Sequence, residues 1–125
     1  MDTFYSPYLN FLRQNVAHLP AVEEKLCFET PAFYVADKLF ARLKEDGETL
    51  AINTEEREKW MEADPDTFFI TDHYLKSKYM LISLNTVKQV TLKELLTQAW
   101  KNRAPKKLLK QFEQQDDDFS RNDNI

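Results

Sequence analysis

The fold is decided by residues 38–53, which read KLFARLKEDGETLAIN. Side chains alternate along residues 38–44, and the two predicted faces are Leu39, Ala41 and Leu43 against Lys38, Phe40, Arg42 and Lys44. Alternation with a period of two predicts a half-buried strand. The Asp46-Gly47 pair between two alternating runs predicts a hairpin, with a return strand over residues 49–53.

The segments on either side of this hairpin predict further strands of the same sheet and a set of helices. An apolar stripe at three- and four-residue steps predicts a first helix that ends near His18, before Pro20. The other expected strands cover residues 25–29, 32–35, 68–71 and 79–84, and Thr30-Pro31 separates the first two. A short helix is expected over residues 55–63. Adjacent strands with short turns, and helices grouped near the ends, predict an α+β fold: an antiparallel sheet with helices packed on one side, in two layers.

A capping box predicts the start of the next helix. Thr91 and Glu94 have the spacing at which each side chain satisfies a free backbone amide, and Val90 and Leu95 would form the hydrophobic staple around them. Ala104-Pro105 breaks or kinks this helix, and a last helix is expected over residues 105–114.

Length and composition favour a single domain. A chain of 125 residues forms one domain, which we place at residues 1–112, with an acidic, disordered tail at residues 113–125. One cysteine excludes an intrachain disulfide. With no apolar run long enough to span a membrane and no signal-peptide pattern at the N-terminus, we expect a cytoplasmic protein without membrane contact.

The net charge of −4 conceals an asymmetry. Residues 1–75 carry 7 Lys/Arg and 15 Asp/Glu, residues 76–110 carry 9 Lys/Arg and one acid, and residues 111–125 carry one Arg and 5 acids. The basic stretch is a candidate binding face, although basic residues on C-terminal helices also commonly just face water.

Few residues are suited to catalysis. His18, His73 and Cys27 lie far apart in the sequence and lack metal-ligand spacing. A single glycine excludes the phosphate-binding loops of nucleotide enzymes. We therefore expect a protein that is not an enzyme, with no catalytic residues, no metal and no cofactor.

Two segments carry the candidate binding chemistry. Lys106 and Lys107 follow Pro105 in the first turn of the last helix, where cations oppose the helix dipole but can bind an anion. The alternatives are one continuous kinked helix without a free N-terminus, or lysines that pair with acidic residues. The turn over residues 72–78 combines His73 and Tyr74 with two lysines, a mixture that can contact phosphates and stack on bases.

Several motifs resemble the MmcQ/YjbR-like family. They are TPAF (30–33), KLFARL (38–43), ADP (63–65), FF (68–69), TDHY (71–74) and AWKNRAPKKL (99–108). The resemblance covers residues 5–112 and implies a fold of the CyaY-like or "double wing" type, a bacterial source and the description "DNA-binding protein". Two departures stand out: Asp37 replaces a usual glycine, and Lys76-Ser77-Lys78 replaces a glycine-rich stretch.

The sequence favours a non-enzymatic binding role, with double-stranded DNA as the first partner. The phosphate-binding candidates are Lys76, Lys78, Lys101, Arg103, Lys106, Lys107 and Lys110, with His73 and Tyr74 nearby. The alternative is a module for a protein partner or a small anionic ligand, which would use the sheet face or a cleft beside Trp60 and Trp100. A third hypothesis is an enzyme site around His73. We expect a monomer or a weak dimer.

Overall fold

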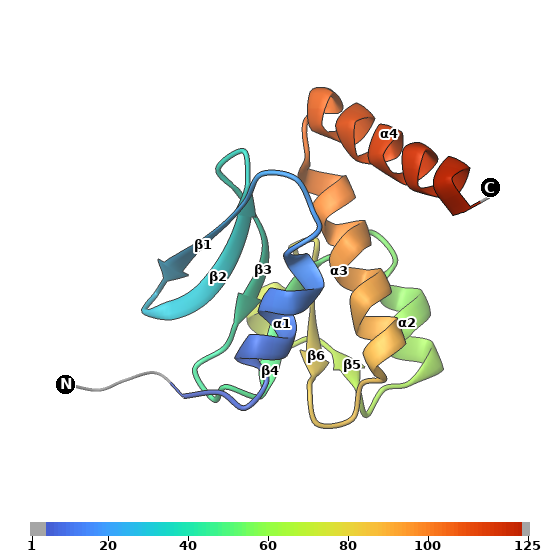
Figure 1. Ribbon diagram of the computed structural model, residues 1–125. Helices are drawn as coiled ribbons and strands as arrows, with labels where there is room; N and C mark the ends of the chain where they lie inside the picture. The colour runs from blue at the N-terminus through green and yellow to red at the C-terminus, as the bar shows by residue number, and fades with distance from the viewer. Residues whose placement is uncertain (1–4, 124–125) are drawn as a thin grey trace.

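The computed structural model describes residues 5–123. Its elements, shown in Figure 1, are α1 (Leu9–Val16), β1 (Val22–Cys27), β2 (Thr30–Val35), β3 (Lys38–Leu43), β4 (Thr49–Asn53), α2 (Arg57–Ala63), β5 (Phe68–Phe69), the short 3-10 helix η1 (Asp72–Tyr74), β6 (Tyr79–Ser83), α3 (Gln89–Arg103) and α4 (Lys106–Asp123).

The strands form one antiparallel sheet in the order β1-β2-β3-β4-β6-β5. Strands β1 to β4 follow one another through short turns, whereas the chain between β4 and β6 forms α2, the edge strand β5 and η1. Figure 1 shows α1 and α3 side by side in front of the sheet, with α4 turning away from the end of α3. The predicted α+β fold, with an antiparallel sheet and helices packed on it, is confirmed.

The hydrophobic core fills the space between the sheet and these helices. It includes Leu12 and Val16 of α1, Leu43, Leu50, Ile52, Met80 and Ile82 of the sheet, and Leu92, Leu95, Leu96 and Trp100 of α3. Trp100 has no exposed surface, and its indole N–H donates to the carbonyl of Pro20 at 3.0 Å. Trp100 therefore lines no cleft, which corrects that part of the prediction, whereas Trp60 lines a small pocket of about 50 Å³.

Strand β3 departs from the predicted alternation at one point. Phe33 pairs with Ala41 but Tyr34 pairs with Leu39, so Phe40 is an extra residue in a β-bulge. Phe40 and Ala41 both enter the core, while Leu39 lies on the opposite face. The predicted faces are right for the second half of the strand and wrong for Leu39 and Phe40, because one extra residue inverts a pattern of period two.

Two tight turns hold residues other than glycine at positive φ. The β1–β2 turn is Phe28-Glu29, with φ of 50° and 70°. The predicted break at Thr30-Pro31 is therefore wrong, because these residues begin β2. The β2–β3 turn is formed by Ala36 and Asp37, with φ of 49° and 63°. Positive φ at both central residues matches the right-handed twist of the flanking strands.

The predicted hairpin between β3 and β4 is confirmed. Gly47 has a φ of 70°, and a Cβ at this position would lie 2.6 Å from the carbonyl oxygen of Tyr5. The Asp46 carboxylate accepts hydrogen bonds from the backbone N–H groups of Glu48 and Thr49, both at 2.9 Å. Glycine permits the turn, and Asp46 stabilises it.

Helix α3 begins two residues before the predicted capping box. The amide of Leu92 already donates to the carbonyl of Lys88 at 2.9 Å, which places Thr91 and Glu94 inside the helix. No side chain caps its N-terminus, and Val90 is 75% exposed, so it forms no staple with buried Leu95. The capping-box prediction is wrong, because burial of one helix face positions the helix more strongly than a local cap does.

The last two helices are separate. Helix α3 ends at Arg103, Ala104 has an extended backbone with ψ of 141°, and α4 begins at Lys106. The carbonyl of Pro105 accepts from the amides of Leu108 and Leu109. Pro105, predicted as the first helical residue, therefore lies one position before the observed start at Lys106. One continuous kinked helix is thereby excluded.

The C-terminal residues extend the last helix. Helix α4 continues through residue 113 to Asp123, while residues 1–4 and 124–125 lie outside the described part of the chain. The division into a domain at 1–112 and a disordered tail at 113–125 stays a prediction. Among the described residues, no helix has both the length and the apolar character needed to cross a bilayer.

Candidate functional site

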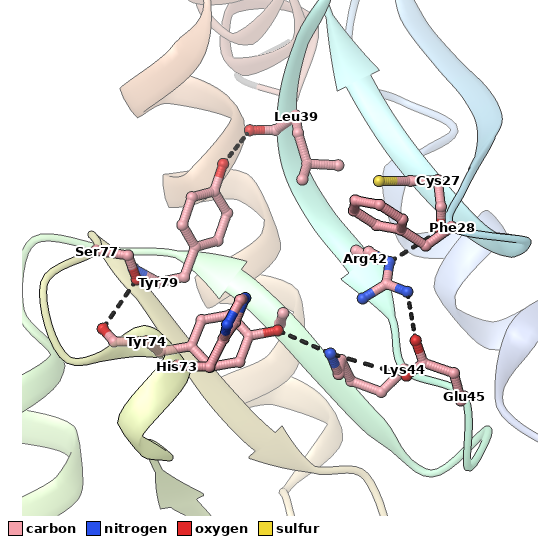
Figure 2. A pocket seen from close by; sticks show the side chains of 11 residues that line it. Cys27, Phe28, Leu39, Arg42, Lys44, Glu45, His73, Tyr74, Ser77 and Tyr79 are labelled. Carbon is pink, nitrogen blue, oxygen red and sulfur yellow. Dashed lines mark hydrogen bonds and ion pairs between the residues drawn. The ribbon is translucent and has the colours of Figure 1, made fainter.

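The sheet face opposite the helices carries a pocket of about 530 Å³. Its lining residues come from β1, β3, β4 and β6, from the turns that follow β1 and β3, and from η1 and the loop after it: Cys27, Phe28, Leu39, Arg42, Lys44, Glu45, Ala51, His73, Tyr74, Ser77 and Tyr79. They alternate along the strands with the core residues, which places the pocket on the second face of the sheet. Figure 2 shows the η1 segment facing β3 across this pocket.

Arg42 lies at the centre of this face. It pairs with Ala32 on β2 and with Ala51 on β4, so small side chains flank it on both sides. Its side chain is only 8% exposed. The guanidinium Nε donates to the carbonyl of Cys27 at 3.0 Å, and the Phe28 ring centroid lies 5.3 Å from its Cζ. A buried cation needs such partners, because loss of water around a charge is costly.

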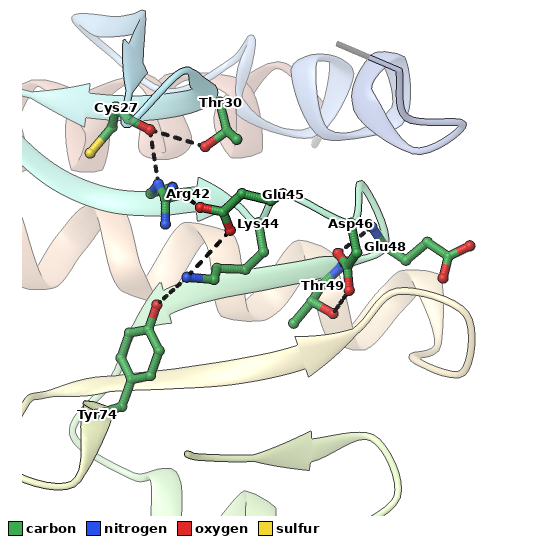
Figure 3. Close-up of polar contacts among 9 residues, drawn as sticks. All are labelled: Cys27, Thr30, Arg42, Lys44, Glu45, Asp46, Glu48, Thr49 and Tyr74. Atoms are coloured by element: carbon green, nitrogen blue, oxygen red, sulfur yellow. Dashed lines mark hydrogen bonds and ion pairs between the residues drawn. The ribbon is translucent and has the colours of Figure 1, made fainter. Parts of the chain in front are cut away.

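Lys44 provides a second cation on the same face. Its Nζ donates to the hydroxyl of Tyr74 at 2.9 Å and lies 3.8 Å from Oε2 of Glu45. The other oxygen of Glu45, Oε1, accepts from Nη2 of Arg42 at 2.6 Å. One carboxylate thus bridges two cations, as Figure 3 shows. The hydrogen bond from Arg42 lowers the pKa of Glu45 below its ordinary value.

A single arginine of α2 holds the opposite wall of the pocket. Arg57 donates from Nη1 to the carbonyls of Tyr74, at 2.8 Å, and Tyr79, at 3.1 Å, and from Nη2 to the carbonyl of Leu75, at 2.6 Å. The hydroxyl of Ser77 also donates to the carbonyl of Tyr74, at 3.0 Å. These bonds fix the segment from η1 to β6, and with it the position of the Tyr74 ring.

Tyr79 forms part of the floor. Its hydroxyl donates to the carbonyl of Leu39 at 2.7 Å, across the bulge of β3. A phenol is protonated at neutral pH at its ordinary pKa of about 10, and burial raises the pKa of Tyr79 further, so its hydroxyl is a donor.

The structure brings only two of the predicted site residues to this pocket. His73 and Tyr74 line it, and their rings meet edge to face with centroids 5.0 Å apart. Lys76 is exposed in the following loop, and Lys78 pairs with Glu55 at 3.3 Å. The predicted lysines of the loop thus lie beside the pocket segment but do not line the pocket.

The other predicted site residues lie on α3 and α4. Lys101 lies over the ring of Phe112, with 5.4 Å between Nζ and the ring centroid. Arg103 has a structural contact, because its Nε donates to the carbonyl of Leu39 at 3.2 Å. The remaining three, Lys106, Lys107 and Lys110, are exposed on α4.

Sequence reasoning missed Arg42, Lys44 and Glu45 as site residues. The alternation places Arg42 and Lys44, two residues apart, on one face of a half-buried strand, but it gives that face no binding role. An antiparallel sheet commonly leaves one face to solvent, so the sequence carries no clear signal that this face forms a pocket.

The arrangement suits binding of an anion next to an apolar group. Two cations, one phenol hydroxyl and aromatic walls converge on one concave surface, the usual composition of small-molecule sites. Among the described residues, no three His, Cys, Asp or Glu side chains gather to hold a metal ion.

The fold and the pocket define a class: a small α+β protein whose antiparallel sheet has one face covered by helices and a second face hollowed by a cationic pocket. A sequence model of the YjbR family matches residues 17–102, more than half of the chain. The chain therefore belongs to the YjbR family, and the resemblance seen in its motifs is confirmed.

The fold is similar to that of solved structures. The crystal structure of the Deinococcus radiodurans protein DR2400, with domain DUF419, matches with a TM-score of 0.68 and 24% sequence identity, and covers 90% of this chain and 91% of that chain. No curated protein matches the chain significantly.

Proposed function

We propose that this protein is a non-enzymatic binding module that takes a small anionic molecule in the pocket on the open face of its sheet. The observation that carries the proposal is Arg42, whose side chain is 8% exposed yet reaches into a pocket of about 530 Å³. A buried guanidinium is costly to maintain, and proteins commonly keep one where it recognises a carboxylate or a phosphate.

The rest of the lining supports a small ligand. Pockets of about 300–1,000 Å³ with mostly apolar walls and a few convergent polar groups are typical of small-molecule sites. Here the apolar walls are Phe28, Leu39, Ala51 and the tyrosine rings, and the polar groups are Arg42, Lys44 and the hydroxyl of Tyr74. Glu45 reduces the net positive charge but lies at the rim, with 63% of its side chain exposed.

The proposal is tested by following backbone amide NMR signals during titration with benzoate, inorganic phosphate and uncharged benzamide. We expect the anions, and not benzamide, to shift signals of β3 and the segment from Tyr74 to Tyr79. Lys44→Gln should weaken this binding, because it removes a cation of the pocket while leaving the buried Arg42 in place. Lys107→Gln, an equal change of charge on exposed α4, is the matched control. Anion-induced shifts that are absent, or confined to other regions, contradict the proposal.

Duplex DNA binding is a second candidate, favoured by a separate observation. Lys106, Lys107 and Lys110 are exposed near the start of α4, and none of them forms an ion pair with a side chain that the structure describes. Phosphate neutralisation by such lysines gives salt-dependent binding with little sequence preference.

Fluorescence anisotropy of labelled duplex DNA at low and moderate salt tests this second candidate. Binding that weakens with salt and is lost in Lys106→Glu/Lys107→Glu supports it, with Lys44→Gln as the variant that should bind DNA unchanged. No binding at low salt contradicts it, independently of the result for small anions.

A further inference from the structure

We infer that the ligand of the pocket is a carboxylate with a flat apolar body, and that Glu45 is an internal competitor for its position. This inference rests on the proposed function and adds the ligand class and a regulatory contact within the site. It starts from the way in which the Glu45 carboxylate divides its two oxygens between Arg42 and Lys44.

The Glu45 contact shows that the two cations are spaced for a single carboxylate. Oε1 lies 2.6 Å from Nη2 of Arg42, and Oε2 lies 3.8 Å from Nζ of Lys44. Charge-assisted contacts of this kind set both the position and the plane of a carboxylate. A ligand carboxylate that enters the same place meets both cations and, in addition, the hydroxyl of Tyr74 beside Lys44.

Glu45 can leave this position without disturbing the hairpin. Its side chain is 63% exposed, so it reaches the cations from the rim and not from the interior. The turn itself is held by Asp46, whose carboxylate accepts from the amides of Glu48 and Thr49 and from the Thr49 hydroxyl at 2.8 Å. Rotation of the Glu45 side chain into solvent therefore breaks its contacts with the cations and leaves the contacts of Asp46 in place.

The walls define the body of the ligand. Phe28 and Leu39 border the guanidinium on one side, while Tyr74 and Tyr79 face them from the other, as Figure 2 shows. The Tyr79 hydroxyl is directed to the carbonyl of Leu39, so its ring presents an apolar surface to the pocket. Aromatic walls favour a planar apolar group, and a third phosphate oxygen would face apolar atoms without a donor, at a cost in desolvation.

The test uses isothermal titration calorimetry with three probes of one shape: 2-naphthoate, uncharged 2-naphthamide and 2-naphthyl phosphate. Wild-type protein should bind 2-naphthoate more tightly than the other two probes. Glu45→Gln, which keeps the shape but removes the competing charge, should tighten 2-naphthoate binding about two- to fivefold, the range expected for release of one partly exposed ion pair. Binding of 2-naphthamide should not change.

The matched control is Glu48→Gln in the same hairpin. The Glu48 carboxylate contacts the Asn85 amide at 3.3 Å and points away from the cations, as Figure 3 shows, so its loss should leave 2-naphthoate affinity unchanged. Equal tightening in both variants would mean a general effect of net charge and would overturn the role of Glu45.

The remaining outcomes separate this inference from the proposed function. If 2-naphthoate binds but Glu45→Gln leaves its affinity unchanged or weakens it, the competitor is disproved while the pocket stands. If 2-naphthyl phosphate binds more tightly than 2-naphthoate, the carboxylate class is wrong. If neither naphthyl anion binds to either form, and benzoate and phosphate cause no shifts in the pocket, the proposed function itself fails.

Discussion

The hydroxyl of Tyr79 donates a 2.7 Å hydrogen bond to the carbonyl of Leu39, forty positions earlier in the chain. Leu39 precedes the extra residue of the β3 bulge, where the regular ladder is interrupted. Arg103 donates to the same carbonyl from α3, at 3.2 Å. The carbonyl oxygen of Leu39 thus joins the β3 bulge to Tyr79 of the pocket floor and to Arg103 at the end of α3.

Tyr79→Phe should lower the free energy of unfolding by about 1 kcal/mol, because Arg103 still satisfies the carbonyl when the hydroxyl is gone. Arg103→Met should lower the free energy of unfolding by a similar amount, because the Tyr79 hydroxyl still donates to the Leu39 carbonyl. The double variant should lower the free energy of unfolding by more than the sum of the two single variants, since it leaves the Leu39 carbonyl without either donor. Urea unfolding of the four proteins measures this coupling, and strict additivity would contradict a shared role.

Glu45 should make the free energy of unfolding depend on pH in the acidic range. The hydrogen bond from Arg42 lowers its pKa in the folded state relative to the ordinary value of 4.5. The Glu45 carboxylate therefore takes up a proton at higher pH in the unfolded chain than in the folded protein. The stabilisation from its contact with Arg42 is fully present above the ordinary value of 4.5 and is lost as the pH falls through the lowered pKa of the folded state. Urea unfolding across this pH range should show a smaller decrease in the free energy of unfolding for Glu45→Gln than for wild type.

The control for this pH effect is Glu48→Gln, which removes a carboxylate from the same turn without removing a contact to a cation. This variant should retain the steeper decrease in the free energy of unfolding with falling pH that wild type shows. Parallel curves for wild type and Glu45→Gln would show that the Arg42–Glu45 contact does not contribute to acid sensitivity.

Arg57→Lys should loosen the wall of the pocket. Lysine retains the charge but cannot donate in a fixed fork to the carbonyls of Tyr74, Leu75 and Tyr79. We expect a loss of about 1–2 kcal/mol in stability and faster amide hydrogen exchange from η1 to the start of β6. Arg13→Lys is the control, because Arg13 forms a more exposed ion pair with Glu24 on the other side of the sheet. Equal exchange in the two variants would contradict the role of Arg57.

Gly47→Ala should destabilise the protein by about 1–3 kcal/mol. The positive φ of 70° disfavours any side chain, and the new Cβ would lie 2.6 Å from the carbonyl oxygen of Tyr5. Thermal unfolding measures the loss. An unchanged melting temperature would mean that the turn and the segment around Tyr5 rearrange freely.

Ala36→Gly should have the opposite effect, because Ala36 holds a φ of 49° in the β2–β3 turn. Left-handed backbone costs a residue with a Cβ about 1–2 kcal/mol, and glycine adopts it readily. We expect a gain of up to about 1 kcal/mol in the same unfolding measurement. Asp37→Gly should gain less, since Asp tolerates this conformation better. A loss of stability in Ala36→Gly would contradict this account.

Much of the fold could be predicted because its signals are local. The alternation around Ala41 and the Asp46-Gly47 turn depend on neighbouring residues, and both were predicted correctly. The break at Thr30-Pro31 and the cap at Thr91 were predicted wrongly for a common reason. Strand pairing placed Phe28-Glu29 in the turn, and burial of the α3 face moved the start of that helix, so tertiary contacts outweighed local preference.

The candidate site was only partly predictable. His73 and Tyr74 were identified from their chemistry, whereas the predicted lysines lie outside the pocket. Arg42 and Lys44 share one face of the predicted half-buried strand, and the alternation does not mark that face as a site, because charged side chains in a strand commonly face water.

By itself, the sequence determined the α+β class, the hairpin over residues 38–53 and the family of the protein, since backbone conformation and the period of burial are properties of short segments. Only the tertiary structure decided that Arg42 is buried. Its surroundings come from the pairing of β3 with β2 and β4 and from the β1–β2 turn, which brings the Cys27 carbonyl and the Phe28 ring to the guanidinium. The chemical role of a charged side chain depends on what covers it, and that cover comes from residues distant in the sequence.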